Sequence, residues 1–155
     1  MAKAARAIAG KDVDKVIEAL NKALADEWLA YMQYWFAEKL VNETEVRKAL
    51  EDVSKEELEH AGELTERIMH LGGKPIVNPK EFDSKTNCGY TVPSEDAQKV
   101  LNDSIKGEGC AIGVYNSILK MTRDSDPVTY QVVLHILQEE IEHEQKFTDL
   151  LTWIA

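Results

Sequence analysis

Apolar residues recur every three or four positions through four long stretches of the chain, a spacing that predicts α-helices with one buried face. In the first stretch Val13, Val16 and Leu20 keep this spacing. In the fourth stretch Val133 and Ile136 keep it. The sequence therefore predicts an all-α protein with helices over about residues 12–40, 44–71, 95–123 and 127–153.

Residues that favour helix ends stand at the borders of these stretches. Asp12 is the expected N-cap of the first helix, and Ser94 is that of the third. Gly72-Gly73 is a typical C-terminal stop for the second helix. Asp126 followed by Pro127 predicts an N-cap and a first helical residue, so the fourth helix should begin there.

The lengths of the connections predict how the helices are arranged. The first and last connections are short, which favours two antiparallel helical hairpins. The middle connection, residues 73–93, contains Pro75, Pro79 and Pro93 and has no helical period. Its roughly twenty residues, at about 3.3 Å each, can run the full length of a helix. We therefore predict a four-helix bundle with a long crossover between helices 2 and 3.

Each predicted apolar face is interrupted near its middle by a glutamate, and in two helices also by a histidine three residues later. Positions i and i+3 lie on one face of a helix, so each glutamate and its histidine should be neighbours. All interruptions lie about a dozen to fifteen residues from a helix start, which places them at one level of the bundle. The six residues are Glu27, Glu57, His60, Glu108, Glu140 and His143.

The two halves of the chain repeat this pattern, which implies a pseudo-twofold axis through the charged layer. Tyr34 follows the first glutamate by seven residues, and Tyr115 follows the third by the same distance. On a helix this spacing returns to the same face, so both hydroxyls are expected to hydrogen-bond ligand carboxylates. An ordinary core role remains an alternative for Tyr115.

A layer of four carboxylates and two imidazoles predicts metal binding. Buried charges are costly unless they are paired or bound to a metal, and no Lys or Arg lies on these faces at this level. Two divalent ions would neutralise four carboxylates. Carboxylate with imidazole suits iron or manganese, and the missing thiolates argue against a structural zinc site. The competing interpretation is a bundle with buried glutamates that are protonated or salt-bridged.

Composition narrows the class of protein. The 155 residues suffice for one domain, here residues 1–155, and 44% hydrophobic with 30% charged residues is typical of a soluble globular protein. A net charge of -10 makes nucleic acid an unlikely main partner, since only Lys3, Arg6 and Lys11 form a short basic N-terminal arm. No segment has the pattern of a signal peptide or a membrane span, so we expect a cytoplasmic protein.

These motifs resemble the ferritin-like superfamily of di-iron carboxylate proteins over almost the whole chain, and most of all the bacterioferritins and the related Dps-like ferritins. The resemblance implies that Glu27 with His60 binds one iron and that Glu108 with His143 binds the other. It implies that two residues, Glu57 and Glu140, bridge the ions. Glu56 and Glu139 are the alternatives one position away, but neither lies i, i+3 from its histidine.

Three departures refine the resemblance. Leu58 stands where bacterioferritin has its haem-ligating methionine, so no haem is expected. The chain ends about a dozen residues after His143, which favours a twelve-subunit shell over a 24-subunit cage. Cys88 and Cys110 resemble the cysteine pair of the Dps-like ferritins called thioferritins. They form a disulfide, a redox pair that feeds electrons to the site, or two packed thiols, and a cytoplasmic location favours the reduced or transient states.

A few further residues carry expectations of their own. Gly107 and Gly109 flank Glu108 in mid-helix, which a close approach of the crossover or a local π-bulge would explain. His70 and His135 lie off the charged layer and are expected at the surface. The first helix is apolar nearly all round between Trp28 and Ala37, which predicts a subunit interface that includes Trp28, Met32, Trp35 and Phe36.

The layer and the resemblance together imply a ferroxidase. Such a protein would bind two Fe(II) per subunit, oxidise them with H2O2 or O2, and store Fe(III) inside a hollow homo-oligomer, which protects the cell from oxidants. One alternative is a di-metal peroxidase or manganese catalase that stores no iron. Another is a structural bundle that binds zinc and oxidises nothing.

Overall fold

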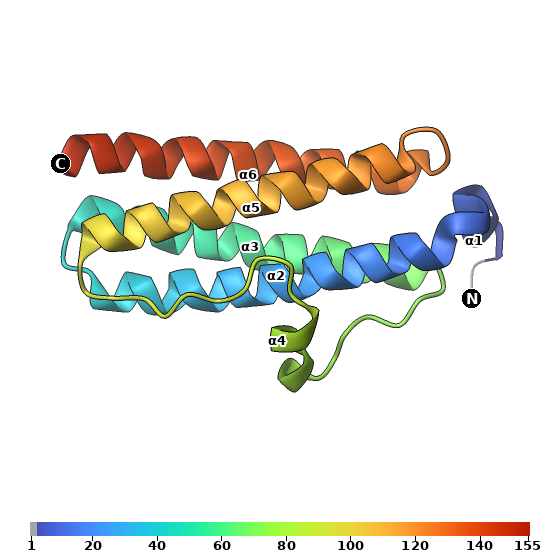
Figure 1. Ribbon diagram of the computed structural model, residues 1–155, viewed down its shortest axis with the longest axis horizontal. Helices are drawn as coiled ribbons and strands as arrows, with labels where there is room; N and C mark the ends of the chain where they lie inside the picture. The colour runs from blue at the N-terminus through green and yellow to red at the C-terminus, as the bar shows by residue number, and fades with distance from the viewer. Residues whose placement is uncertain (1–2) are drawn as a thin grey trace.

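The computed structural model describes residues 3–155 as a bundle of long helices, with no strand in that range. Figure 1 shows the long helices lying side by side, with the C-terminus at the end opposite the N-terminal helix. The all-α prediction is confirmed. Met1 and Ala2, with which the predicted domain begins, lie outside the described residues. The elements are α1 (Lys3–Ala9), the 3-10 turn η1 (Gly10–Asp12), α2 (Val13–Leu40), α3 (Thr44–His70), η2 (Pro79–Glu81), α4 (Phe82–Lys85), α5 (Ala97–Thr122) and α6 (Pro127–Ile154).

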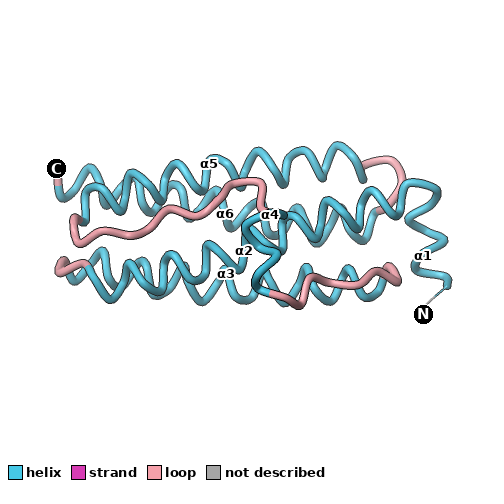
Figure 2. The backbone as a smooth tube through the Cα atoms, turned by 60° about the horizontal axis from the view of Figure 1, so that its bottom comes forward, coloured by secondary structure: helices cyan, strands magenta, loops and turns pink. Residues whose placement is uncertain are grey.

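The four long helices form two antiparallel hairpins, α2 with α3 and α5 with α6, joined by a long connection. Figures 1 and 2 show this connection running along the bundle from one end to the other, so that α3 and α5 point the same way. The predicted four-helix bundle with its crossover is therefore confirmed. The short helix α4, which interrupts the crossover near its middle, was not expected from the sequence.

The glycine stop after α3 behaves as predicted. Gly72 has a positive φ of 75°, and its amide donates to the carbonyl of Met69 at 3.0 Å. The next amide, of Gly73, donates to Ile68 at 2.9 Å. A Cβ on Gly73 would lie 2.7 Å from the side chain of Ile17, so the chain can leave the helix against α2 only with glycine here.

Two predicted helix starts are wrong in detail. Asp12 makes no side-chain capping bond, because the chain is already helical before it in α1 and η1. Asp96, not Ser94, caps α5, and its carboxylate accepts from the amides of Gln98 at 2.9 Å and Lys99 at 3.3 Å. A carboxylate can accept both bonds and carries a charge that the helix dipole favours.

At the other end of the bundle, α6 begins as the sequence predicts. Asp126 caps it by accepting from the amide of Thr129 at 3.0 Å, and Pro127 occupies the first helical position. The same carboxylate pairs with Arg67 of α3 at 3.1 Å, and both side chains are buried. This pair ties the two hairpins together, since breaking a buried pair leaves a charge without a partner.

The apolar core is divided into two clusters, one at each side of a buried polar layer. Leu20, Leu64 and Ile136 belong to the first cluster. Leu50 and Phe147 belong to the second. The clusters separate the layer from solvent at both ends of the bundle, so any charge in it sits in a medium of low polarity.

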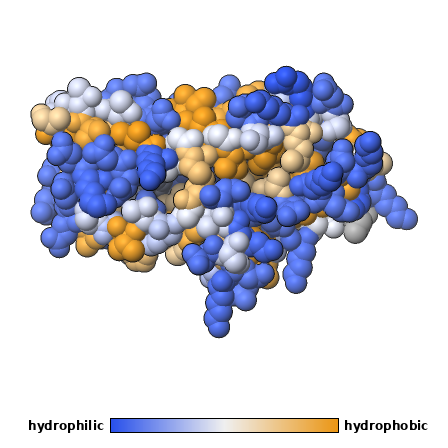
Figure 3. Space-filling model, viewed as in Figure 1, coloured by the Kyte–Doolittle hydropathy of each residue, from blue (hydrophilic) through white to orange (hydrophobic). Residues whose placement is uncertain are grey.

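The surface is mostly hydrophilic, with apolar patches between the charged side chains on the face that Figure 3 shows. Trp35 and Phe36 of α2 are 45% and 46% exposed, whereas Trp28 stacks on Phe82 of α4 with ring centroids 6.3 Å apart. Part of the apolar surface of α2 is thus covered within the chain itself. None of the helices in residues 3–155 combines the length and the apolarity that crossing a bilayer requires.

Candidate metal centre

The predicted polar layer is a compact buried cluster. Helices α2 and α5 each supply one glutamate, and α3 and α6 each supply one Glu-x-x-His pair. Each helix turns its apolar stripe inward, so the residue that interrupts the stripe is carried into the core with it. All six side chains are at most 2% exposed: Glu27, Glu57, His60, Glu108, Glu140 and His143.

These residues form two overlapping groups, within each of which four possible ligand atoms lie within 4.8 Å of one another. Two residues, Glu57 and Glu140, belong to both groups. The first group adds one glutamate and one histidine from the α2–α3 hairpin, Glu27 and His60, and the second adds the corresponding pair from α5–α6, Glu108 and His143. Two residues shared by two groups are what a pair of neighbouring ions needs for bridging ligands.

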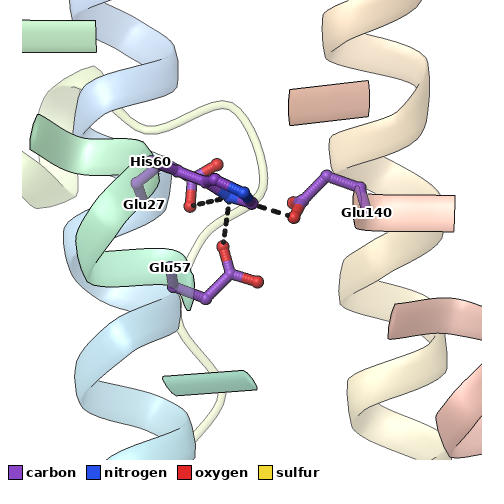
Figure 4. A group of neighbouring side chains, drawn as sticks. All are labelled: Glu27, Glu57, His60 and Glu140. Atoms are coloured by element: carbon purple, nitrogen blue, oxygen red, sulfur yellow. Dashed lines mark ion pairs between the residues drawn. The ribbon is translucent and has the colours of Figure 1, made fainter. Parts of the chain in front are cut away.

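The imidazole of His60 lies at the centre of the first group. Its Nδ1 is 3.5 Å from Glu27 Oε2, 3.4 Å from Glu57 Oε2 and 3.3 Å from Glu140 Oε1. Figure 4 shows the three carboxylates pointing toward the ring, with Glu140 reaching it from the opposite hairpin. The donors therefore converge on one small volume.

The second group repeats this geometry. The Nδ1 of His143 is 2.9 Å from Glu57 Oε1, 3.6 Å from Glu108 Oε1 and 3.2 Å from Glu140 Oε1. The two imidazole centroids are 5.9 Å apart. The structure thus has the pseudo-twofold arrangement that the repeated sequence pattern implies.

Hydrogen bonds around the cluster cross from one hairpin to the other. The hydroxyl of Tyr34 donates to Glu108 Oε1 at 2.6 Å, and that of Tyr115 donates to Glu27 Oε1. Both tyrosines are buried. The carboxylates of Glu27 and Glu108 are therefore each oriented by a side chain from the other half of the molecule.

Two residues that sequence reasoning set aside hold the histidine rings. The outer nitrogen of His60, Nε2, lies 3.3 Å from Glu139 Oε2, and that of His143 lies 2.5 Å from Glu56 Oε2. A carboxylate at this position accepts a hydrogen bond from Nε2–H, which keeps the ring proton on Nε2 and leaves Nδ1 facing the cluster as a possible ligand. The doubled Glu-Glu at the start of each motif was the available signal.

The surface histidines lie where the sequence predicts. His70 and His135 are outside the cluster and partly exposed. The Nε2 of His135 lies 2.8 Å from the second oxygen of Glu139.

Crowding of the acids perturbs their ionisation. Burial, followed by the charge of Glu140, raises the pKa of Glu57 well above its ordinary value and that of Glu108 to about 8. For Glu140 burial acts in the same direction, but the close approach of the His143 and His60 imidazoles prevails and brings its pKa down to about 2. Burial lowers the pKa of the two imidazoles, but the carboxylates around them have the larger effect. The pKa of His60 and that of His143 are therefore raised above the ordinary value. The metal-free cluster therefore retains protons that metal ions would displace.

Several inward-facing atoms of the cluster have no hydrogen-bond partner within residues 3–155. Both oxygens of Glu57 and the Nδ1 of both histidines belong to this set. Such atoms are rare in folded proteins because leaving a buried polar atom unpaired is costly. Here they surround one volume and are of the types that divalent transition metals bind, so the residues fit a metal pair.

A pocket of about 420 Å³ leads from the surface to this cluster. Its inner wall includes Glu27, Glu108 and Glu140, and its outer wall includes Cys88 and Cys110. The two cysteines are joined by a disulfide, with Cα atoms 5.9 Å apart. Of the three arrangements open from the sequence, the structure has the disulfide and not the reduced pair that a cytoplasmic location favours.

Neither expected explanation for the glycines beside Glu108 holds. A Cβ at Gly107 would meet nothing within 4 Å, and at Gly109 it would meet only Glu144 Oε2, at 4.0 Å. Helix α5 is α-helical through both positions, with no π-bulge. Gly107 lines the pocket, so the missing side chain leaves that route wider.

A bundle of this topology with one glutamate from each of two helices and Glu-x-x-His from each of the others defines the ferritin-like class of di-metal carboxylate proteins. The chain belongs to the ferritin family, whose ferritin-like domain matches residues 17–155.

Three relatives illustrate this membership. The structure of a dodecameric thioferritin, the bacterioferritin-related protein of Bacteroides fragilis, superposes with a TM-score of 0.95 at 38% identity and covers 100% of this chain and 95% of that one. A DNA protection during starvation protein of Pyrococcus furiosus is 36% identical over 92% of this chain and 80% of its own length. A bacterioferritin of Desulfovibrio desulfuricans is 30% identical over 83% of this chain and 70% of its own length.

Proposed function

We propose that this chain is the ferroxidase subunit of a ferritin-type cage. It binds two Fe(II) ions, oxidises them with H2O2 or O2, and retains the Fe(III) as mineral inside a hollow homo-oligomer, thereby protecting against oxidative stress. The observation that carries the proposal is the sharing of Glu57 and Glu140 between two adjacent groups of donors. A site for a single metal ion would not require two carboxylates that belong to two groups of donors.

Each residue has a role that follows from its position. Glu27 with His60 would hold one Fe(II), Glu108 with His143 would hold the other, and the two shared glutamates would bridge them. Four carboxylates balance the charge of two divalent ions, and each additional positive charge after oxidation weakens that balance. Oxidation leaves two positive charges uncompensated, and hydrolysis, which adds oxide or hydroxide and releases protons, would restore neutrality as the Fe(III) passes to a mineral.

The redox step balances without a further reactant. Two Fe(II) give one electron each, and H2O2 takes both electrons with two protons to form two molecules of water. Iron here is the substrate, whether or not manganese can also occupy the donors. The protein contributes geometry and a site enclosed by apolar clusters, which limits side reactions.

The assembly is proposed from the relatives. The protein from Bacteroides fragilis is a dodecamer, and we propose twelve subunits for this chain as well. The exposed aromatic pair Trp35 and Phe36 on α2 is available for such an interface, along with Met32. Leu58, 41% exposed, offers no sulfur ligand, so the proposal includes no haem.

The test is Fe(II) oxidation at two ions per subunit, followed by the rise in Fe(III) absorbance with H2O2 or O2 as the oxidant. Glu57→Ala should abolish the fast phase, because one carboxylate is lost from both ion positions. Glu59→Ala, an exposed residue two positions away, is the matched control and should oxidise iron at the wild-type rate. Full activity of Glu57→Ala would refute the site.

The same preparation distinguishes the alternatives. Mineral iron that co-elutes with a particle of about twelve subunits supports storage. Sustained peroxide consumption without mineral would indicate a peroxidase or a manganese catalase. Tight zinc binding without iron oxidation under either oxidant would indicate a structural bundle.

A further inference from the structure

Asp26 is the neighbour of Glu27 on α2, but its carboxylate faces the crossover and not the metal centre. Its Oδ1 accepts hydrogen bonds from the hydroxyl of Thr86 at 2.5 Å, the amide of Asn87 at 2.8 Å and the amide of Cys88 at 2.9 Å. Its Oδ2 accepts from the side-chain amide of Asn87 at 2.8 Å. One carboxylate thus receives four donors from three consecutive residues.

This carboxylate is unusual because it is buried without a basic partner. Asp26 is 9% exposed, and no Lys or Arg within residues 3–155 forms an ion pair with it. Its charge is stabilised by the loop donors alone, and hydrogen bonds to a charged acceptor are about twice as strong as those between neutral groups. The interaction therefore fixes the loop firmly, even though the loop has no secondary structure of its own.

The last residue of the fixed segment is Cys88, whose disulfide partner Cys110 lies on α5. Asp26 holds the backbone amide of Cys88 directly, so it places the sulfur independently of the S–S bond. Both cysteines line the pocket that reaches Glu27 and Glu108. The position of this short loop thus affects both the disulfide and the pocket that reaches the metal centre.

We propose that Asp26 is a positioning residue for the thiol–disulfide couple: it keeps Cys88 beside Cys110 when the bond is reduced, and so sets how readily the bond re-forms at the pocket entrance. This goes beyond the proposed iron chemistry. In the reaction a dithiol reductant gives two electrons and two protons. The S–S bond breaks, Cys88 and Cys110 each gain a hydrogen, and the reductant becomes a disulfide.

The direction of the effect follows from effective concentration. Closing the disulfide spans 22 residues of chain, and a loop free to move places its thiol near the partner only part of the time. Asp26 removes that freedom in both redox states. Its loss should therefore favour the dithiol by at least about tenfold in the equilibrium constant, which corresponds to a potential about 30 mV more positive.

The chain contains a matched control for a merely structural role. Asn21, on the same helix, holds a different part of the same crossover: its side chain donates to the carbonyl of Lys74 at 3.0 Å and accepts from the amide of Ile76 at 3.0 Å. Asn21→Ala should loosen the crossover to a comparable extent without freeing Cys88.

The experiment uses the full-length, metal-free protein, so its result does not depend on the ferroxidase proposal. Wild type, Asp26→Ala, Asp26→Asn and Asn21→Ala are equilibrated in graded ratios of reduced to oxidised dithiothreitol, quenched with an alkylating agent and read by mass. We expect a shift of at least about tenfold toward the dithiol in Asp26→Ala, a smaller shift in Asp26→Asn, and none in Asn21→Ala. Asparagine keeps one acceptor oxygen but cannot accept from the side-chain amide of Asn87.

Two results would overturn the proposal. One is an Asp26→Ala protein whose equilibrium constant is within about twofold of wild type, and the other is an equal shift in Asn21→Ala. If Asp26→Ala does not fold, Thr86→Val provides the same decision. This substitution removes the hydroxyl that donates to Asp26 and accepts from the amide of Gly89. It should therefore also shift the thiol–disulfide equilibrium toward the dithiol, and an unchanged equilibrium constant would refute the proposal.

Discussion

Replacing Glu57 by glutamine should remove most of the stability that divalent metal ions give this protein. Glu57 is fully buried, and its carboxylate belongs to both groups of donors. Glutamine has the same size but no charge, so both ion positions lose part of their compensation at once. A substitution in Glu27 would affect one position only.

The size of the effect can be worked out from mass action. An ion present at about 100 times its dissociation constant stabilises the folded state by about 2.7 kcal/mol, so two ions give about 5 kcal/mol. In a protein of 155 residues each kcal/mol raises the melting temperature by about 2–4 °C, which predicts an increase of about 10–20 °C for the wild type. For Glu57→Gln we expect less than half of this increase.

Without metal, Glu57→Gln should be as stable as the wild type or more stable. Both carboxylate oxygens of Glu57 lack hydrogen-bond partners, and burial and the neighbouring acids raise the pKa of this carboxyl group. Removing a group that is unfavourably placed in the metal-free state should leave the stability unchanged or raise it. The predicted signature is therefore an equal or higher melting temperature without metal, together with a weak response to metal.

The assay is thermal unfolding by circular dichroism, with Co(II) as a redox-stable ion and with chelator as the metal-free reference. Glu59→Gln, on the exposed side of the same helix, serves as the control and should respond like the wild type. An increase in melting temperature on adding Co(II) that is as large in Glu57→Gln as in the wild type would contradict this prediction.

Three further predictions concern protons, the buried ion pair and one glycine. Binding of two Co(II) at pH 7 should release more than one proton per subunit, because Glu108 has a pKa of about 8 in the metal-free protein and must lose its proton to coordinate. The proton from Glu108 should no longer be released when the pH is well above 8. A dye-monitored titration that detects no proton release at pH 7 would contradict this prediction. Asp126→Ala should destabilise the fold by about 3–5 kcal/mol in urea unfolding, because Arg67 is left buried without its partner; a loss below about 1 kcal/mol would show that the pair does not tie the hairpins. Gly113→Ala should stabilise α5 by about 1 kcal/mol in the same assay, because a Cβ there meets nothing within 4 Å, and a loss of stability would show hidden strain.

The bundle could be predicted from the sequence because its signals are local and repeated. Each long helix carries an apolar stripe along its whole length, broken only at the charged layer, and the glycines after α3 make the expected C-terminal bonds. The charged layer could be predicted for the same reason, because a glutamate on an apolar stripe is buried together with that stripe. Position along a stripe is enough to find such residues, even before the packing is known.

Other features depend on contacts between distant segments, which the pattern does not encode. Helix α1 is too short for a periodic signal, and it is held by Arg6, which donates to the carbonyl of Leu71 at 3.0 Å. Glu56 and Glu139 have the sequence neighbourhood of solvent-facing acids, and only the docking of the hairpins brings each to the opposite histidine. The role of Asp26 could not be predicted from the sequence because its hydrogen-bond partners lie 60 residues or more away along the chain.

The cross-hairpin bonds make the metal centre an indicator of complete folding. Neither hairpin alone has a full set of donors, and four of the six residues, Glu27, Glu108 and both histidines, are oriented by a group on the other hairpin. A half-docked intermediate has carboxylates without their orienting partners and should hold iron poorly. On the proposed function, newly made subunits would not react with iron and peroxide until the last interface has closed.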